Sequence, residues 1–224
     1  MASENALCAW VICAVVPLCL CLIRVIAVLP ALRDGRKQKS HSESDIPVDT
    51  SLMIFLGSGG HTGEMLRLLE NTDISQCHRT WLVSSGDAAS LMKAKKYEES
   101  TRSFKNVNYA ELHRARKVGE SLALSTLSTI KSIFSTVQQL SLLPKPDILL
   151  VNGPGTSVPI AYTLFFMSLF GGCKTKIVYI ESLARVHNLS LSGRLIMPIA
   201  NRFLVQWAPL AFKYQRAEYY GILI

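Results

Sequence analysis

The chain has 224 residues and a formal net charge of +8, and residues 51–224 hold the whole excess, with 19 basic against 11 acidic side chains. Compact domains usually run from ~100 to ~200 residues, so this length suits one domain plus an appendage and leaves little room for two. A basic domain indicates an anionic partner: phosphate groups, a membrane surface or nucleic acid. Four of the six cysteines lie in one apolar stretch, which argues against a disulfide framework or a metal site and fits a reducing compartment.

The amino-terminal stretch is apolar, uncharged from Ala6 to Ile23, and it resumes after Arg24 up to Leu32. A helix of ~20 apolar residues crosses a bilayer, so residues 1–32 are predicted to be a lumenal tip and a single transmembrane anchor. Positive charge marks the cytosolic flank, so the main domain is expected in the cytosol. The alternative is a cleaved signal peptide, whose basic residues precede a shorter apolar core. Here the basic residues follow instead: Arg33, Arg36, Lys37 and Lys39.

The rest of the chain predicts a polar linker and then one α/β domain. Residues 33–50 are rich in Ser and Asp and are expected to lack structure of their own. From residue 51 onward, short apolar runs alternate with longer helical stretches, which is typical of parallel strands joined by helices. Besides a helix through Met65 and Leu69, helices are expected at 118–143 and 158–170, the second a buried core helix too short to span a bilayer. Strands are expected at 51–56, 80–83, 107–112, 148–151, 176–180 and 201–205.

A glycine-rich segment, Gly57-Ser58-Gly59-Gly60-His61-Thr62-Gly63-Glu64, stands where the first predicted strand meets a helix. Glycines let the backbone turn sharply and approach a ligand, and the amides at a helix start attract an anion such as a diphosphate. The segment lacks the spacing of a dinucleotide fingerprint and the lysine of a P-loop. A glycine turn without a ligand is the alternative. His61 is a candidate base for a sugar hydroxyl, or else a residue that only caps the helix.

Two further features follow predicted strands. The loop Asn152-Gly153-Pro154-Gly155-Thr156 comes directly after the strand at 148–151. Ligands of doubly wound sheets bind beyond the carboxyl ends of strands, so the two glycine loops are expected to converge on one site. Glu181 follows the strand at 176–180 and is either a candidate acid, base or hydroxyl ligand, or a charged residue that marks the exit into solvent. No recognition helix or aromatic platform supports nucleic-acid binding.

Four separated motifs carry a resemblance to a known family. The two glycine loops, the run Val178-Tyr179-Ile180-Glu181-Ser182 and Val205-Gln206-Trp207 occur in order behind the apolar stretch. Together they resemble the asparagine-linked glycosylation protein 14 family, the membrane subunit of the eukaryotic UDP-N-acetylglucosamine transferase, over nearly all of the chain. That family is more distantly similar to the acceptor-binding half of the bacterial enzyme that makes peptidoglycan lipid II. The resemblance implies a Rossmann-like parallel sheet over residues 51–224 that is one half of a GT-B glycosyltransferase.

By this resemblance, the complex adds a second N-acetylglucosamine from UDP-N-acetylglucosamine to dolichyl-diphosphate-N-acetylglucosamine on the cytosolic face of the endoplasmic reticulum membrane. The donor-binding catalytic half is expected in a soluble partner of the asparagine-linked glycosylation protein 13 family, so this chain should be inactive alone. The residues agree on one point, because a two-domain transferase needs two Rossmann-like halves and residues 51–224 supply one. No cofactor and no metal are expected.

Site residues follow from the two loops and the chain end. His61 or Glu181 would assist deprotonation of the acceptor hydroxyl. The residues expected to hold the acceptor diphosphate are Gly57, Ser58, Gly59, Gly60, Thr62, Asn152, Gly153, Gly155 and Thr156. An apolar cluster that would be unusual in water is expected to bind the partner: Tyr219, Tyr220, Ile222, Leu223 and Ile224. Two rivals are a non-catalytic membrane scaffold that recruits the catalytic subunit, and a reductase, which the lack of an acidic residue after the second strand weakens.

Overall fold

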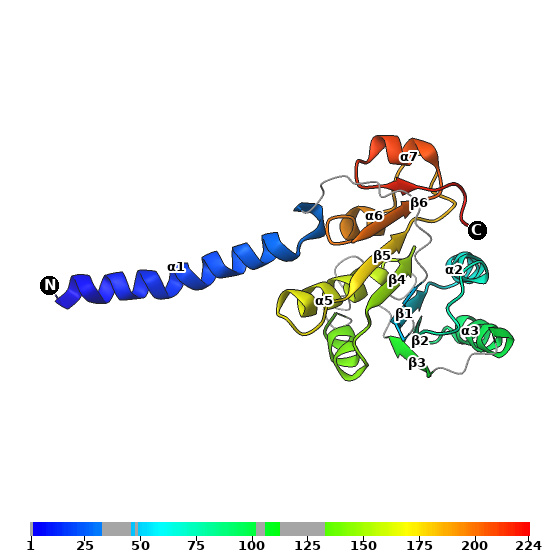
Figure 1. The fold of residues 1–224 in the computed structure, drawn as a ribbon, viewed down its shortest axis with the longest axis horizontal. Coiled ribbons are helices and arrows are strands. Elements are labelled where there is room, and N and C mark those ends of the chain that lie inside the picture. The colour runs from blue at the N-terminus through cyan, green and yellow to red at the C-terminus, as the bar shows by residue number, and fades with distance from the viewer. Residues whose placement is uncertain (1, 33–45, 48, 102–105, 113–132) are drawn as a thin grey trace, which may run out of the picture.

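The structure is a computed structural model that describes residues 2–32, 46–47, 49–101, 106–112 and 133–224. A long helix, α1 (Ala2–Val28), projects from an α/β domain and is followed by a short 3-10 helix, η1 (Pro30–Leu32) (Figure 1). Within these described residues, no helix combines the length and hydropathy required of a membrane span. The transmembrane assignment of residues 1–32 therefore stays a prediction, and most of the predicted linker lies outside the described residues.

The domain is built on a parallel sheet that contains, in the described residues, seven strands in the order β3-β2-β1-β4-β5-β6-β7. Every neighbouring pair is parallel, which confirms the predicted class of sheet. All the predicted strands are present, and only the two-residue β7 was not expected, since so short a strand gives no apolar run. The bounds are β1 (Ser51–Leu56), β2 (His78–Ser84), β3 (Val107–Leu112), β4 (Ile148–Asn152), β5 (Lys176–Ile180), β6 (Arg202–Val205) and β7 (Glu218–Tyr219).

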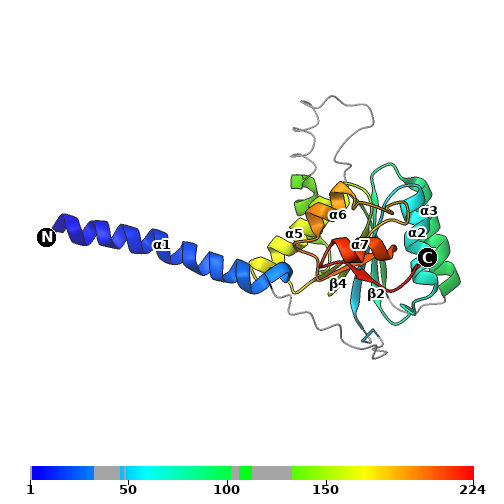
Figure 2. The same cartoon turned by 90° about the horizontal axis from the view of Figure 1, so that it is seen from above.

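Helices cover both faces of the sheet (Figure 2). One face carries α2 (Gly60–Glu70) and α3 (Ala88–Thr101), and the other carries α5 (Ser157–Leu169) and α6 (Leu191–Ile196). A short helix, α7 (Ala208–Lys213), precedes β7. Residues 133–142 are helical as predicted, whereas the earlier part of that predicted helix lies outside the described residues. The core helix expected at 158–170 is confirmed as α5 within one residue at each end.

The alternation of side chains along β1 builds the two halves of the core. Met53 and Phe55 face the cluster that contains Leu164 of α5, while Ile54 faces the cluster that contains Met65 of α2. Successive side chains of a strand point to opposite faces, and a central parallel strand is buried on both. The continuous apolar run of β1 is therefore explained by its central place, and its carboxyl end reaches the same edge of the sheet as those of β4 and β5.

A buried ion pair attaches α3 to β2. The guanidinium of Arg79 has no exposed surface and donates to both carboxylate oxygens of Glu98, each at 2.7 Å. Its remaining nitrogen donates to the carbonyl oxygens of Ile74 and Cys77, and Trp81 Nε1 also donates to Glu98. A buried charge of this kind is stable only when its hydrogen bonds are satisfied, as they are here. The network fixes residues 74–77, the loop before β2, at the amino edge of the sheet and away from the glycine loops.

Candidate functional site

The candidate site lies where the chain reverses its direction of winding across the sheet. β1 has β2 on one side and β4 on the other: the chain first adds β2 and β3 on one side of β1 and then crosses over to add β4 to β7 on the other. In open parallel sheets, ligands bind in the crevice beyond the carboxyl ends of the strands at such a switch point. The glycine-rich segment follows β1, and the second glycine loop follows β4, so both loops stand at this edge.

The two loops are packed against each other with His61 between them. Asn152 Nδ2 donates to the carbonyl oxygen of His61 at 2.8 Å. Gly153 has a φ of +64° and lies so close to the imidazole that an added Cβ would collide with the ring of His61. A Cβ at Gly57 would collide with the ring of Pro154. Both glycines are therefore required by close approach, and the convergence expected from the sequence is present.

The start of α2 is open to solvent. Gly59 precedes the helix with a φ of +67°, and a Cβ built at Gly59 or Gly60 would meet no described atom within 4 Å. Ser58 and Gly155 are exposed as well. The first amides of a helix have no carbonyl partner within it, and the helix dipole adds positive potential there. The exposed part of the predicted diphosphate site thus offers backbone amides with room around them.

Other members of the predicted set are buried and shape the loops. The Thr62 hydroxyl donates to the carbonyl oxygen of Gly57 and lies 2.7 Å from the Ser90 hydroxyl, inside the domain. Thr156 and Asn152 are 8% and 2% exposed. Within the described structure, the side-chain oxygen of Asn152 is buried with no hydrogen-bond partner. Such an unsatisfied acceptor costs ~1–3 kcal/mol, so this residue holds the loops together at an energetic cost.

Glu64 is a site residue that the sequence analysis quoted without giving it a role. One carboxylate oxygen lies 3.4 Å from His61 Nδ1, and the other accepts hydrogen bonds from the Ser182 hydroxyl at 2.8 Å and the Leu183 amide at 3.2 Å. Residues three apart on a helix are neighbours, so the spacing of His61 and Glu64 was the available signal. A carboxylate beside Nδ1 favours the tautomer whose Nε2 is free to accept a proton.

Glu181 is fully buried and organises the segment that follows β5. Its carboxylate accepts hydrogen bonds from the Ser190 amide at 3.0 Å, the Ser190 hydroxyl at 3.1 Å and the Ser182 amide at 3.2 Å. Burial raises the pKa of this carboxyl group, and the hydrogen bonds from Ser190 and Ser182 oppose that rise. The interpretation of Glu181 as a residue marking the strand's exit into solvent is wrong. Its described contacts hold residues 182–190 in place rather than face the glycine loops.

The carboxyl-terminal cluster divides into an exposed and a packed part. Tyr219, Tyr220 and Ile222 are 41%, 43% and 56% exposed. Leu223 is held by its amide, which donates to Gln206 Oε1 at 3.1 Å. Ile224 borders a cavity of about 10 Å³ that Glu64 and Asn152 also line. The tail therefore passes beside α2 to the margin of the candidate site, as Figure 1 also shows.

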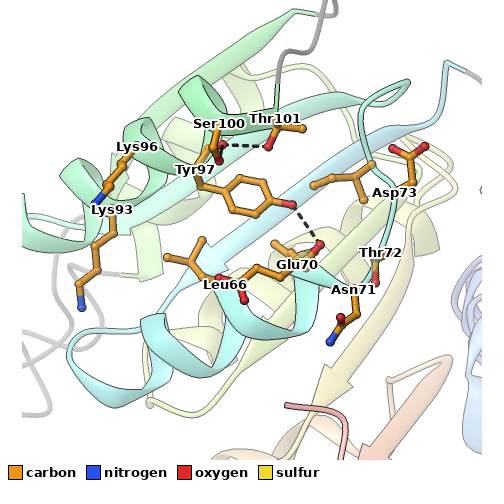
Figure 3. A pocket seen from close by; sticks show the side chains of 12 residues that line it. Leu66, Glu70, Asn71, Thr72, Asp73, Lys93, Lys96, Tyr97, Ser100 and Thr101 are labelled. Atoms are coloured by element: carbon orange, nitrogen blue, oxygen red, sulfur yellow. Dashed lines mark hydrogen bonds between the residues drawn. The ribbon is translucent and has the colours of Figure 1, made fainter.

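A polar hollow of about 750 Å³ lies elsewhere, between the last turns of α2 and α3 (Figure 3). Its lining includes Glu70, Lys93, Lys96 and Tyr97, whose hydroxyl donates to the Leu69 carbonyl oxygen at 3.1 Å. Both helices begin at the carboxyl edge of the sheet, so this hollow lies toward the opposite edge and contains none of the predicted site residues. Among the described residues, no group of three or more potential ligands could hold a metal ion.

Solved structures share this fold over about half of their length. MurG of Acinetobacter baumannii superposes with a TM-score of 0.53 at 15% identity, over 76% of this chain and 45% of that one. Arabidopsis thaliana UGT89C1, solved with UDP-L-rhamnose, gives a TM-score of 0.50 at 11% identity, over 80% and 53%. This chain therefore spans about half the length of each. The fold defines the class: a Rossmann-like unit of the kind that makes up one half of a GT-B glycosyltransferase.

Sequence comparison places the chain within that class. Residues 52–223 match the family described as "Oligosaccharide biosynthesis protein Alg14 like". A Debaryomyces hansenii protein named UDP-N-acetylglucosamine transferase subunit ALG14 is 52% identical over 100% of both chains. The Mus musculus protein of that name is 36% identical over 77% of this chain and 82% of its own. The chain belongs to the Alg14-like family, which confirms the resemblance carried by the four motifs.

Proposed function

We propose that the chain is the acceptor-binding subunit of an N-acetylglucosaminyltransferase that uses UDP-N-acetylglucosamine as donor. The reaction class is supported by the relatives, which are named subunits of a UDP-N-acetylglucosamine transferase. The observation that carries the role is the meeting of the two glycine loops around His61 at the carboxyl edge of the sheet. The acceptor is dolichyl-diphosphate-N-acetylglucosamine, whose sugar receives the second N-acetylglucosamine of the precursor.

The acceptor diphosphate binds at the start of α2. Gly59 and Gly60 are exposed there, with open space where a Cβ would be, and the helix dipole favours an anion by ~0.3–1 kcal/mol. Ser58 and Gly155 supply exposed polar groups from the two loops, and the excess positive charge of residues 51–224 adds a general attraction. The buried members of the predicted set give the loops their shape: Gly57, Thr62, Asn152, Gly153 and Thr156.

His61 acts as the base. Nε2 accepts the proton of the acceptor hydroxyl while that oxygen bonds to the anomeric carbon of the donor sugar and UDP leaves. Glu64 at Nδ1 stabilises the resulting imidazolium, and Ser182 and the Leu183 amide fix the carboxylate of Glu64. Glu181 contributes indirectly, because it anchors the segment that carries Ser182. A proton acceptor must be within reach of its substrate, and in the described conformation His61 meets that condition better than the buried Glu181.

A second chain completes the enzyme. Residues 51–224 form one Rossmann-like unit, whereas the transferases that share the fold are about twice as long. The missing half binds UDP-N-acetylglucosamine and is a soluble subunit of the asparagine-linked glycosylation protein 13 family. The exposed side chains of Tyr219, Tyr220 and Ile222 form part of the contact with it, since they lie on the tail that reaches the margin of the site.

α1 attaches the subunit to the endoplasmic reticulum membrane, with the domain on the cytosolic side. Most of its exposed side chains over the second half are apolar, including Leu20, Leu22, Ile23 and Ile26, and Arg24 is the charged exception. Burial of such side chains in hydrocarbon is favourable at about 25 cal/mol per Å². The basic residues after Leu32 favour the cytosol as the side on which the domain resides.

The test is transfer from UDP-N-acetylglucosamine to a polyisoprenyl-diphosphate-N-acetylglucosamine, first with this chain alone and then with the soluble partner added. We expect activity only from the pair, and a loss of roughly 10²- to 10⁴-fold in kcat for His61→Ala at equal amounts of assembled complex. Normal transfer by assembled His61→Ala complexes would instead favour the rival function, a membrane scaffold without active-site residues.

A further inference from the structure

An apolar groove of about 820 Å³ runs along α5, between that helix, α6 and the helical residues 133–142. None of the described residues that line it carries a charge. The α5 sequence explains the groove, because this helix is apolar on all sides and only one side faces the sheet. Ile160 and Leu164 are buried in the core, while Tyr162 and Phe166 line the groove. The Tyr162 hydroxyl donates to the Leu195 carbonyl oxygen at 2.9 Å and thereby joins α5 to α6.

The groove connects two features of the molecule. At its first end lies Gly155, the exposed glycine of the second loop. Its other end lies at Phe170, 80% exposed, directly after α5. There Arg24 of α1 donates to the Leu169 carbonyl oxygen at 2.9 Å and to the Ser168 carbonyl oxygen at 3.3 Å. A helix rises 1.5 Å per residue, so the groove follows α5 for about 20 Å from the glycine loop to the point where α1 joins the domain.

The lining indicates the chemistry of the occupant. Ligand sites for single small molecules measure ~300 to ~1,000 Å³ and are lined mostly by apolar side chains, which fits this groove. A contiguous apolar hollow in contact with water is unfavourable unless something apolar covers it. A flexible hydrocarbon chain needs neither charges nor hydrogen-bond partners from its surroundings. Such a chain requires only that the groove begin at the binding site of its polar head group and end near a lipid phase.

We propose that this groove binds the first isoprene units of the acceptor, those next to the diphosphate, and directs the rest of the chain toward α1. The inference rests on the proposed function, which puts the acceptor diphosphate at Gly155 and the neighbouring start of α2. The groove fits this occupant because it is continuous with the diphosphate site at one end and with the membrane attachment at the other. It gives the protein a way to prefer lipid-linked acceptors over water-soluble ones.

The experiment uses the full chain assembled with its partner and two acceptors with the same diphosphate-N-acetylglucosamine head. One acceptor carries a polyisoprenoid chain, and the other carries a short alkyl group that ends near Gly155. Phe166→Ser is the groove variant, and Phe212→Ser on α7, outside the groove and 89% exposed, is the matched control. We expect Phe166→Ser to raise the apparent KM for the long acceptor by roughly tenfold and to leave the short one unchanged. Phe212→Ser should change neither.

A second measurement does not depend on transfer. A polyisoprenyl diphosphate with a photoreactive diazirine in its first isoprene units should label peptides from residues 157–169, and unlabelled acceptor should compete. An equal rise in KM for both acceptors, no rise for either, or absence of competed labelling would overturn the groove assignment. So would loss of partner assembly in Phe166→Ser, or loss of its attachment to vesicles without acceptor, since the groove would then be a protein or bilayer contact. Failure of the proposed function is distinct: the unmodified pair would transfer to neither acceptor.

Discussion

The carboxylate of Glu64 lies 3.4 Å from Nδ1 of His61, one turn along α2, and it is held there by the Ser182 hydroxyl from the far side of β4. A glutamine at position 64 would retain one oxygen for Ser182 but present an NH₂ group to His61. Nδ1 would then have to accept a hydrogen bond from that NH₂ group, so the ring proton would move to Nε2. Nε2 is the atom that, in the proposed mechanism, should accept the proton of the acceptor hydroxyl. The contact with Glu64 thus sets the tautomer of His61, the proposed base.

Glu64→Gln should therefore lower kcat by roughly 10²-fold, with the KM for both substrates little changed. Assembly with the partner should remain normal, because the substituted side chain is nearly the same size. Steady-state kinetics of the assembled pair, normalised to complex, provide the measurement. Should kcat stay within twofold of the unmodified pair, Glu64 has no part in proton transfer.

Substitutions at Gly60 separate ligand binding from folding. An added Cβ meets no described atom, so Gly60→Ala should fold normally, and Gly60→Asp should even stabilise α2 through the helix dipole. Both should raise the apparent KM for the lipid acceptor, the aspartate by more, because it also repels the diphosphate. Gly63→Ala, further along α2 and equally free of contacts, is the control. Unaltered acceptor kinetics in Gly60→Asp would contradict a diphosphate site at this helix start.

Alanine substitutions at Gly153 and Gly86 allow the effect of backbone strain on the stability of the fold to be separated from the effect of a side-chain collision. Both have positive φ values, +64° and +77°, but a Cβ at Gly86 meets no described atom, whereas one at Gly153 collides with His61. Gly86→Ala should cost roughly 1 kcal/mol from backbone strain alone, and Gly153→Ala roughly 3 kcal/mol or more from strain and collision. Thermal unfolding of the full chain in mild detergent would measure the difference. Equal losses would mean that His61 moves aside freely.

Glu181 predicts a pH dependence of stability. Burial raises the pKa of this group in the folded chain above its ordinary value of 4.5. The folded state then binds the proton more tightly than the unfolded state, so this stabilisation is complete below the ordinary value and is lost as the pH rises through the raised pKa. In Glu181→Gln this loss of stability, which sets in as the pH rises above the ordinary value of 4.5, should vanish. Parallel profiles for the two proteins would contradict the raised pKa.

Asn188 tests the proposed orientation. Asn188-Leu189-Ser190 is an acceptor sequence for N-linked glycans, and Asn188 is exposed, with its side-chain oxygen 2.6 Å from Lys213 Nζ. In a cytosolic domain it never meets the lumenal glycosylation enzymes, so the protein from cells should carry no glycan there. Mass spectrometry of the peptide, compared with Asn188→Gln, decides the matter. A glycan on Asn188 would reverse the orientation.

Much of the fold could be predicted because parallel strands buried on both faces give continuous apolar runs. The bounds of β1, β3 and β5 were predicted to the residue. α3 was missed because it buries only Ser90 and Ala94, so its sequence has no apolar period. α6 and α7 were missed because helices of 6 residues are too short to show an apolar periodicity.

The parts of the candidate site formed by residues close together in the sequence could be predicted. The parts formed by residues far apart in the sequence could not. The glycine loops and His61 could be found because each lies within a few residues of a strand end. The bond between Glu64 and Ser182 joins residues 118 positions apart, which no spacing pattern shows. The sequence allowed Glu181 to be interpreted as a residue at the strand's exit into solvent. It is buried instead by residues 190–193, which are brought against it by tertiary packing that no local pattern predicts.

Arg24 has a consequence for how the enzyme meets its substrate. A domain tethered only by a polar linker would swing, and its site would sample every height above the bilayer. The bonds from Arg24 to the last turn of α5 join α1, the proposed membrane helix, to the helix that starts at the second glycine loop. In the proposed arrangement the site is thereby kept at one height above the bilayer, where lipid head groups arrive by lateral diffusion. The search for an acceptor is then two-dimensional, and its rate depends on the surface density of the lipid rather than on its bulk concentration.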